Sequence, residues 1–189
     1  IAGMDNIADM TEALAKFFRY TITKVENLVS VEEELDNCET YFLIQKYRFG
    51  SRLQLHILYE EESRESIMNC KIPKLTLQPI LENSIIHGTE LKIGTGNLTI
   101  QFEQTDKRLI IRISDDGAGM DEQTLAKLNR QLGRGGRALT DQEEKRGGIA
   151  LVNVNNRIHL LFGEEYGIHI YSIKGKGTDV EVTLPVVTA

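Results

Sequence analysis

The sequence predicts an α+β protein, in which a mixed or antiparallel sheet carries helices on one face and a further helix precedes it. Two pairs of segments alternate apolar and polar residues across short polar or glycine-bearing turns, which is typical of antiparallel hairpins. The segments with helical spacing cluster and do not alternate strictly with the strands, so a doubly wound fold is disfavoured. With 189 residues and 41% hydrophobic composition, the chain can bury one core without a disulfide or a structural metal.

The N-terminal part predicts two helices. Residues 5–22 place apolar side chains at helical spacing, with charged residues between them. Residues 31–49 also have helical spacing, with Ser30 as the expected N-cap and glutamates at 32–34, where the helix dipole favours them. Gly50 is expected to end this second helix.

The next part of the chain predicts a strand, a loop and a third helix. Residues 53–59 alternate in polarity and predict a strand, and the acidic stretch 60–65 predicts a loop. Proline is favoured in the first turn of a helix, so Pro73 is expected near the start of a helix that reaches about Gly88.

The first hairpin is predicted in the middle of the chain. Its strands cover 97–103 and 108–114, and a glycine-bearing turn at 115–120 follows. A short helix is expected over about 121–132.

The C-terminal part begins with a stretch that has no apolar period. Residues 133–148 are rich in glycine and charge and predict a mobile loop. Residues 149–162 predict a helix, and residues 168–174 and 179–185 predict the strands of the second hairpin.

The charge balance limits the ligands of the protein. The formal net charge is −6, which removes the long-range attraction that nucleic acid or an anionic membrane surface requires. A phosphate-bearing ligand must therefore be held by local cations. Such cations occur in and around the predicted mobile loop: Lys127, Arg130, Arg134, Arg137, Lys145 and Arg146.

The sequence contains no run of about 18 apolar residues and no signal-peptide pattern. Two cysteines, Cys38 and Cys70, fit a reducing compartment. The chain starts at Ile1, and we expect it to be part of a longer protein.

The first candidate site segment is the predicted helix that carries Glu82 and Asn83. Leu81 and Ile85 are expected to bury one face of this helix, while Asn83 and His87 share another. Adjacent polar groups in an apolar helix are costly to bury without partners. Glu82 and Asn83 therefore face a cleft or a ligand, or they lie on a partly exposed helix face.

The second candidate segment is the turn after a predicted strand. Asp115 ends the strand, and Gly117 and Gly119 follow. A carboxylate at this place can accept a hydrogen bond from a ligand's amino group, and the glycines let the ligand approach. Asp and Gly are also common turn residues, so an ordinary turn is the alternative.

Two further glycine segments lie near the C-terminus. Gly147 and Gly148 precede a predicted helix, whose free N–H groups could bind an anion. The same helix contains Leu151 and Asn153. Thr178 follows the glycine turn of the second hairpin. Taken singly, these segments also fit a capped loop with solvated charges and a plain hairpin turn.

Other phosphate and metal motifs are excluded. The pattern Gly-x-x-x-x-Gly-Lys-Ser/Thr is absent, and no glycine pair completes a dinucleotide fingerprint. The stretch 115–121 is not a calcium loop, because Ala126 stands where the bidentate glutamate belongs.

In their order and spacing, the four segments resemble the N, G1 and G2 boxes and the Gly-Thr turn of the ATP-binding domain shared by histidine kinases, gyrase, Hsp90 and MutL. The match runs from about residue 53 to 185 and implies a two-layer α/β sandwich, the Bergerat or GHKL fold. Segments upstream resemble the LytS/YesM-like sensor histidine kinases: Phe-Phe-Arg-Tyr at 17–20, Glu-Glu-Leu at 33–35, Ile-Gln-Lys-Tyr-Arg-Phe at 44–49 and Ile-Pro-Lys-Leu-Thr-Leu-Gln-Pro at 72–79.

The resemblance implies two parts of the chain. Residues 1–30 would end the dimerisation and phosphoacceptor helices, and residues 31–189 would form the catalytic ATP-binding domain. Residues 5–22 also fit an ordinary amphipathic core helix.

The resemblance also implies roles in binding the base and the metal ion. Asp115 would accept a hydrogen bond from the adenine amino group, with Gly117 and Gly119 shaping the pocket around the base. Thr178 would line the adenine side. Asn83 would hold Mg²⁺ through its amide oxygen, as suits a cation that prefers oxygen ligands.

Further roles concern the phosphates. Gly147, Gly148 and the first N–H groups of the next helix, which carries Leu151 and Asn153, would contact them. Glu82 would act as general base or would polarise the attacking imidazole. As an alternative, its carboxylate lies on the helix surface and repels the phosphates. His87 would touch a phosphate or only stack.

The implied reaction transfers the γ-phosphoryl group of MgATP to a histidine and then to an aspartate of a response regulator. The implied partners are a receiver domain and, in the full-length protein, a second copy. The implied location is the cytoplasmic part of a membrane-anchored bacterial sensor.

The sequence departs from the family pattern in three respects. Ala150 replaces the second glycine of Gly-x-Gly-Leu, so weakened phosphate contact is expected, and residues 121–146 contain no phenylalanine to anchor a lid. No histidine lies in the first predicted helix; the four are His56, His87, His159 and His169. We therefore expect the chain to bind ATP without phosphorylating itself at the usual site. An ATPase clamp like gyrase, Hsp90 or MutL, and a catalytically silent nucleotide-binding module, are the alternatives.

Overall fold

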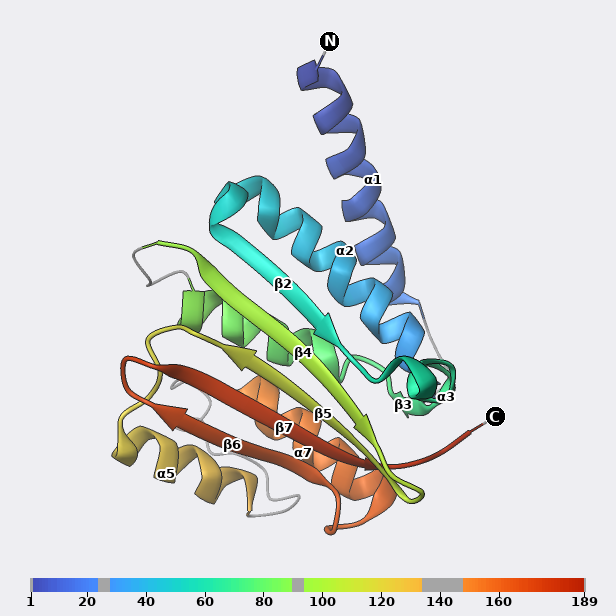
Figure 1. The fold of residues 1–189 in the computed structure, drawn as a ribbon, viewed down its shortest axis with the longest axis vertical. Coiled ribbons are helices and arrows are strands. Elements are labelled where there is room, and N and C mark those ends of the chain that lie inside the picture. The colour runs from blue at the N-terminus through green and yellow to red at the C-terminus, as the bar shows by residue number, and fades with distance from the viewer. Residues whose placement is uncertain (1, 24–27, 90–93, 134–147, 189) are drawn as a thin grey trace.

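The computed structural model describes residues 2–23, 28–89, 94–133 and 148–188 (Figure 1). In chain order, its helices and strands are α1 (Ala2–Ile22), β1 (Leu28–Ser30), α2 (Val31–Phe49), η1 (Gly50–Arg52), β2 (Leu53–Leu58), η2 (Glu61–Ser63), α3 (Arg64–Asn69), β3 (Lys71–Pro73), α4 (Leu77–Asn83), η3 (Ser84–Thr89), β4 (Gly96–Gln104), β5 (Arg108–Asp115), α5 (Glu122–Leu132), α7 (Ile149–Phe162), β6 (Gly167–Ile173) and β7 (Gly177–Pro185).

The main sheet has five strands in the order β2-β4-β5-β7-β6. Strand β2 runs parallel to β4, and the other neighbouring strands are antiparallel. Both predicted hairpins, β4–β5 and β6–β7, are present. The predicted α+β class with a mixed, mostly antiparallel sheet is therefore confirmed.

The two faces of the sheet differ in chemistry. One face is buried beneath α4 and α7, which lie behind the sheet in Figure 1. The side chains that strands β4, β5 and β7 contribute to this core are Leu98, Ile100, Phe102, Leu109, Ile111, Ile113, Val180, Val182 and Leu184. This alternation along each strand is expected when only one face of a sheet is covered.

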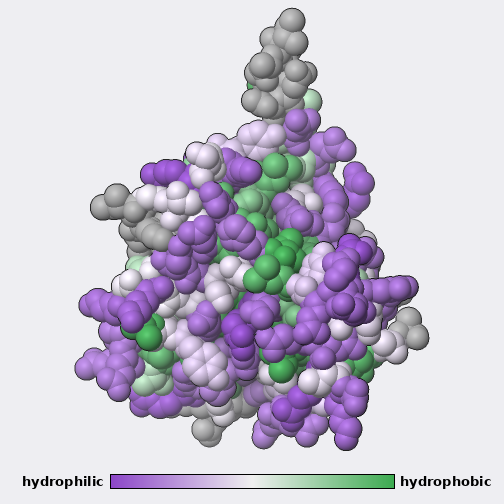
Figure 2. All heavy atoms as spheres, viewed as in Figure 1, coloured by the Kyte–Doolittle hydropathy of each residue, from purple (hydrophilic) through white to green (hydrophobic). Residues whose placement is uncertain are grey.

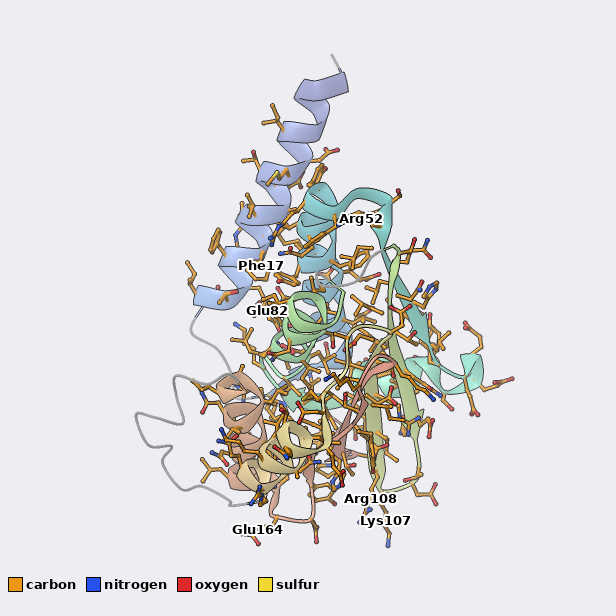
Figure 3. The ribbon with its side chains drawn as sticks, turned by 90° about the vertical axis from the view of Figure 1, so that its left-hand side faces the viewer. Phe17, Arg52, Glu82, Lys107, Arg108 and Glu164 are labelled. Atoms are coloured by element: carbon orange, nitrogen blue, oxygen red, sulfur yellow. The ribbon has the colours of Figure 1, made fainter. Side chains whose placement is uncertain are left out.

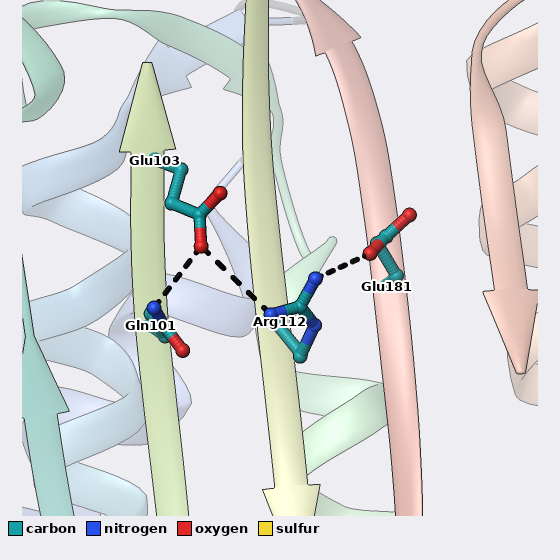
Figure 4. A network of polar contacts seen from close by, with 4 residues as sticks. All are labelled: Gln101, Glu103, Arg112 and Glu181. Atoms are coloured by element: carbon teal, nitrogen blue, oxygen red, sulfur yellow. Dashed lines mark hydrogen bonds and ion pairs between the residues drawn. The ribbon is translucent and has the colours of Figure 1, made fainter. Parts of the chain in front are cut away.

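The other face of the sheet is open and largely hydrophilic (Figure 2). Arg112 lies at its centre and donates to Glu181 at 2.8 Å, while Glu103 on the neighbouring strand lies 3.8 Å away (Figure 4). The hydrogen bond to Glu181 is the main cause that raises the pKa of Arg112, and the charges of Glu181 and Glu103 act in the same direction. Cross-strand charge pairs of this kind give an open sheet face a defined, soluble surface.

Helix α2 begins and ends where the sequence predicts. Ser30 accepts from the Glu33 N–H at 3.1 Å, and the Glu33 carboxylate accepts from the Ser30 N–H at 2.8 Å, which completes a capping box. The hydrogen bonds that the Glu33 carboxylate accepts from the Ser30 N–H and hydroxyl lower the pKa of Glu33. Gly50 ends the helix with a φ of +62°, a conformation that glycine adopts without strain.

Two predictions between residues 60 and 88 are wrong. Instead of an acidic loop over 60–65, the structure has the short helices η2 and α3. Pro73 does not start a helix, because it ends strand β3, which pairs with β1 in a small second sheet. The helix begins at Leu77 and turns into the π-helical segment η3 at Ser84.

Among the described residues, no helix is long and apolar enough to cross a membrane. The predicted mobile loop at 133–148 lies almost entirely outside the described part of the chain, as do its cations Arg134, Arg137, Lys145 and Arg146.

Candidate functional site

The centre of the candidate site is the buried carboxylate of Asp115, at the end of β5. Its side chain accepts from the Gly117 N–H at 3.0 Å, from the Ser84 hydroxyl and from the Thr178 N–H. Burial nevertheless raises the pKa of Asp115 from 3.8 to about 6, because desolvation disfavours the charged form more than these hydrogen bonds favour it. Asp115 is thus a buried acceptor at the open end of a strand.

Thr178 lies beside Asp115 because β7 pairs with β5 in the register that places the two residues opposite each other. The Thr178 hydroxyl contacts the Ser172 hydroxyl at 2.9 Å, so its side chain is held by the neighbouring strand β6. The structure therefore brings together two of the predicted site residues, which are 63 positions apart in the chain (178 − 115).

The glycine turn after Asp115 packs against the β6–β7 hairpin. The Gly175 N–H donates to the Ala118 carbonyl at 2.6 Å, and the Met120 N–H donates to the Ser172 hydroxyl at 2.8 Å. Gly119 has a φ of +61°, and a Cβ atom there would collide with the Ile173 carbonyl. Gly119 is therefore required for backbone packing of the turn.

Gly177 is a site residue that the sequence interpretation did not select. Its φ is +119°, and a Cβ atom there would collide with the backbone carbonyl of Asp115. The available signal was the Gly-Lys-Gly-Thr sequence, but only the register of β5 and β7 shows that the glycine lies against Asp115.

Helix α4 brings the first candidate segment, which carries Glu82 and Asn83, to Asp115. Ser84 follows directly on Asn83 and contacts the Asp115 carboxylate. The Asn83 side-chain N–H donates to the Pro79 carbonyl at 2.7 Å, which orients its amide oxygen away from the helix backbone. Asn83 thus has its amide oxygen turned away from the helix backbone, one residue before Ser84.

Glu82 is partly buried on α4, on the side of the molecule where Figure 3 also labels Phe17 of α1. Its carboxylate accepts a hydrogen bond from the Gln78 amide at 2.7 Å. Glu82 and Asn83 are both partly exposed and each has a hydrogen-bond partner within α4, Gln78 and Pro79 respectively.

The predicted shared face of Asn83 and His87 stays a prediction. The α-helix ends at Asn83, and η3 continues the chain through His87 with π-helical geometry. The side chain of His87 lies outside the described part of the structure.

The predicted phosphate segment begins helix α7. Gly148 has a φ of +86°, and a Cβ atom there would meet Leu128 of α5 at 2.8 Å. The side chain of Leu151 is buried in the core, so Leu151 can contribute only its backbone to an anion site at the start of the helix. The side chain of Asn153 is exposed. Gly147 lies outside the described residues. At this segment the chain offers the first N–H groups of a helix, not converging side chains.

A buried glutamate holds α4 in place. Glu34 of α2 accepts from three successive backbone N–H groups at the start of α4, those of Leu75, Thr76 and Leu77, at 2.6, 2.9 and 3.0 Å. Its other partner is the Tyr20 hydroxyl of α1, at 2.5 Å. Glu34 appeared in the sequence as one of three acids in the first turn of α2, so its position under α4 was not predicted.

Helix α7 is attached to the same turn. Arg157 donates to the Leu75 carbonyl at 2.8 Å, and Leu75 adopts a φ of +58°. Burial lowers the pKa of Arg157, although the charge of Glu34 opposes this. The turn before α4 is therefore a junction of α2, α4 and α7.

The described residues of the site offer oxygen ligands for a metal ion. Within the described residues, no group of three or more His, Cys, Asp and Glu side chains is placed to hold a metal ion. The amide oxygen of Asn83 suits a cation such as Mg²⁺, which takes one or two protein oxygens and fills its other positions with water and phosphate.

These features define a class of protein: an α/β sandwich in which a buried strand-end aspartate, a glycine turn and the end of a helix form one site. The family model of "Histidine kinase-, DNA gyrase B-, and HSP90-like ATPase" matches residues 71–188, and a second model, "Histidine kinase", matches residues 1–53. The chain belongs to the family of histidine kinase-, DNA gyrase B- and HSP90-like ATPases.

Sensor kinases are among the relatives of similar sequence. The sensor histidine kinase YesM of Bacillus subtilis is 35% identical over 95% of this chain, and the sensor protein LytS of Oceanobacillus iheyensis is 35% identical over 91%. The sensor histidine kinase YpdA of Escherichia coli is 31% identical over 91% of the chain. The chain spans only 28%, 28% and 27% of the lengths of these three proteins.

A solved structure has the same fold. The histidine kinase domain from the Erythrobacter litoralis EL346 blue-light activated histidine kinase gives a TM-score of 0.52 at 14% identity, covering 98% of this chain and 81% of that one. The fold and family expected from the sequence are thus confirmed.

Proposed function

We propose that the chain is the ATP-binding catalytic part of a two-component sensor histidine kinase and that it transfers the γ-phosphoryl group of ATP to a histidine. The observation that carries this proposal is the Asp115 site, in a chain similar to sensor kinases along almost its whole length. Residues 31–189 would form this catalytic part, and residues 1–30 would belong to the preceding helical region.

Asp115 would recognise the base. The Asp115 carboxylate already accepts hydrogen bonds from groups of the protein, and it can accept a further one from a ligand that carries an N–H group. The amino group of adenine is such a donor. Gly117 and Gly119 would shape the backbone of the pocket next to this carboxylate, and Thr178 lies opposite Asp115 in the sheet register.

The phosphates would lie toward the start of α7. The N–H groups that follow Gly148 carry no intrahelical partners, and they favour negative charge together with the helix dipole. Asn83 would hold Mg²⁺ through its amide oxygen, and the ion would neutralise phosphate charge when bound.

Glu82 would accept the proton of the attacking imidazole. In this step a histidine nitrogen bonds to the γ-phosphorus, the bond to the ADP oxygen breaks, and the imidazole N–H proton passes to the Glu82 carboxylate. The phosphoryl group would then pass to an aspartate of a response regulator. Phosphoryl transfer depends mainly on positioning and charge neutralisation, which these side chains can supply.

The acceptor histidine would lie outside the 189 residues. His56 and His169 are on strands of the sheet and His159 is on α7, so none of the three is on the N-terminal helices. The family resemblance places the acceptor on a helix of a dimer, and we therefore propose a second copy and a receiver domain as partners in the cytoplasm.

Ala150 favours one alternative, a module that binds nucleotide without catalysis. It is the second residue of α7, where the family pattern has glycine. Alanine is compatible with helical backbone, so we expect weaker phosphate contact and not its loss.

The test uses the kinase that carries its acceptor histidine. Incubation with γ-labelled ATP should give protein-bound label that is lost in acid and retained in base, as phosphohistidine requires. At ATP concentrations below the wild-type Kd, Asp115→Asn should lower this label about 10- to 100-fold. Release of labelled phosphate without labelled protein would favour an ATPase clamp. Nucleotide binding without either product would favour the silent module.

A further inference from the structure

Two buried amides connect Glu82 to helix α2. The Gln78 side-chain N–H donates to the Glu82 carboxylate at 2.7 Å, and the Gln78 oxygen accepts from the Asn37 side-chain N–H at 2.7 Å. Gln78 is 7% exposed and Asn37 is 3% exposed. A continuous chain of side-chain hydrogen bonds therefore runs from α2 to the proposed catalytic carboxylate on α4.

The direction of this chain is fixed by Glu82. An ionised carboxylate only accepts hydrogen bonds, so Gln78 must turn its NH₂ group toward Glu82 and its oxygen toward Asn37. Asn37 must then present its own NH₂ group to Gln78. Its oxygen points away, and this oxygen is a buried atom that has no hydrogen-bond partner among the described residues.

The unpartnered oxygen argues against a role in stability alone. Burying a polar atom without a partner is unfavourable, and an apolar side chain of similar shape at position 78 or 37 would avoid the cost. Helix α4 is already held at its start by Glu34 and Arg157. The hydrogen bond to the Glu82 carboxylate therefore explains these two buried amides better than the packing of the helix does.

We propose that Gln78, supported by Asn37, is a positioning residue for Glu82. This inference rests on the proposed role of Glu82 as the proton acceptor. Gln78 holds one carboxylate oxygen of Glu82 and so restricts its rotamers. The second oxygen is then available to take the imidazole proton. Because Gln78 is buried and its amide is engaged by Glu82 and Asn37, we expect it to affect the rate of transfer and not the binding of ATP.

A double-mutant cycle tests this role in the kinase that carries its acceptor histidine. The variants are Gln78→Met, which keeps the length and helix propensity of the side chain, Glu82→Gln, and the double variant. The measured quantities are the single-turnover rate of autophosphorylation at saturating ATP and the Kd for ATP.

Gln78→Met should lower the rate by about tenfold when Glu82 is present and by less than about twofold in the Glu82→Gln background. The Kd for ATP should change by less than about twofold in every variant. If Gln78→Met does not fold, Asn37→Leu tests the same chain of hydrogen bonds, with a smaller loss in the same direction.

The matched control is Gln101→Met, which removes a hydrogen bond of the same kind on the open sheet face, from Gln101 to Glu103 at 3.0 Å (Figure 4). It should leave the rate unchanged.

Two results would overturn the positioning role alone: an equal loss of rate in both backgrounds, or a weakened Kd for ATP in Gln78→Met. A wild-type kinase that incorporates no phosphate would instead overturn the proposed function, and this role with it.

Discussion

At the scale of the residue, Asp115 holds a charge where the fold would be more stable without one. Its pKa of about 6 in the folded chain lies above the ordinary 3.8, so folding favours the protonated form. Asp115 therefore destabilises the fold above pH 6. This cost diminishes as the pH falls from 6 to 4, and below 4 it is absent. A shift of this size corresponds to about 3 kcal/mol.

We predict that Asp115→Asn raises the free energy of unfolding at pH 7.5, by up to about 3 kcal/mol, because it removes the buried charge. Urea denaturation followed by circular dichroism would measure the difference, which should shrink toward zero at pH 4. Asp106→Asn, at an exposed turn, is the control and should change stability at neither pH. A variant at 115 that is less stable than wild type at pH 7.5 would contradict this assignment.

Gly177 gives a second prediction at this scale. Gly177→Ala should destabilise the chain by about 3 kcal/mol or more, since a Cβ atom there combines an unfavourable φ with a collision against the Asp115 backbone. Gly175→Ala is the matched control, because Gly175 also has a positive φ, of +79°, but has open space around its Cβ position. It should cost only about 1–2 kcal/mol. Equal losses in urea denaturation would show that the contact with Asp115 is unimportant.

At the scale of the element, α4 is the helix that positions the site, and Glu34 supplies its N-terminal cap from another helix. The helix has no capping side chain of its own, because Thr76 turns its hydroxyl to the Pro73 carbonyl at 2.5 Å. A carboxylate at this end satisfies free N–H groups and complements the helix dipole. The Tyr20 hydroxyl ties the same carboxylate to α1, and burial together with Glu34 raises the pKa of Tyr20.

We predict that Tyr20→Phe lowers the free energy of unfolding by about 1.5–3 kcal/mol, the usual value of a hydrogen bond to a charged group. Tyr47→Phe, on the exposed side of α2, serves as the control and should be neutral. Thermal or urea denaturation at pH 7.5 measures both. If the two variants were equally stable, the hydrogen bond to Glu34 would contribute nothing to the attachment of α1.

The sequence predicted the long elements because their signals are local. Caps such as Ser30 and Asp121 and the alternation of the hairpin strands depend on a few neighbouring residues. The errors lie where tertiary contacts decide: Pro73 became part of a strand because β1 pairs with it, and α4 ended in a π-helical turn beside β5. Glu34 and Gln78 were not recognised because each also has a partner that lies 41 positions away in the sequence, Leu75 and Asn37 respectively.

At the scale of the whole molecule, the sheet brings the site together. The β5–β7 pairing places Asp115 next to Thr178, and α4 packs beneath the sheet so that Ser84 reaches the same carboxylate. Asp115, Gly119 and Thr178 could be selected from the sequence because each lies at a strand end or a turn, and their proximity required the strand order. The net charge of −6 remains compatible with a phosphate ligand, because helix N–H groups supply a local anion site.

We propose Asp115 as the acceptor for the base of a bound adenine nucleotide. Calorimetric titration of the chain with ATP and Mg²⁺ tests it most directly, with Asp115→Asn and the control Asp106→Asn measured beside the wild type. The wild type and Asp106→Asn should bind ATP with the same Kd, and Asp115→Asn should bind about 10- to 100-fold more weakly even though its fold is more stable. An Asp115→Asn variant that binds ATP as tightly as the wild type would show that Asp115 does not bind the base.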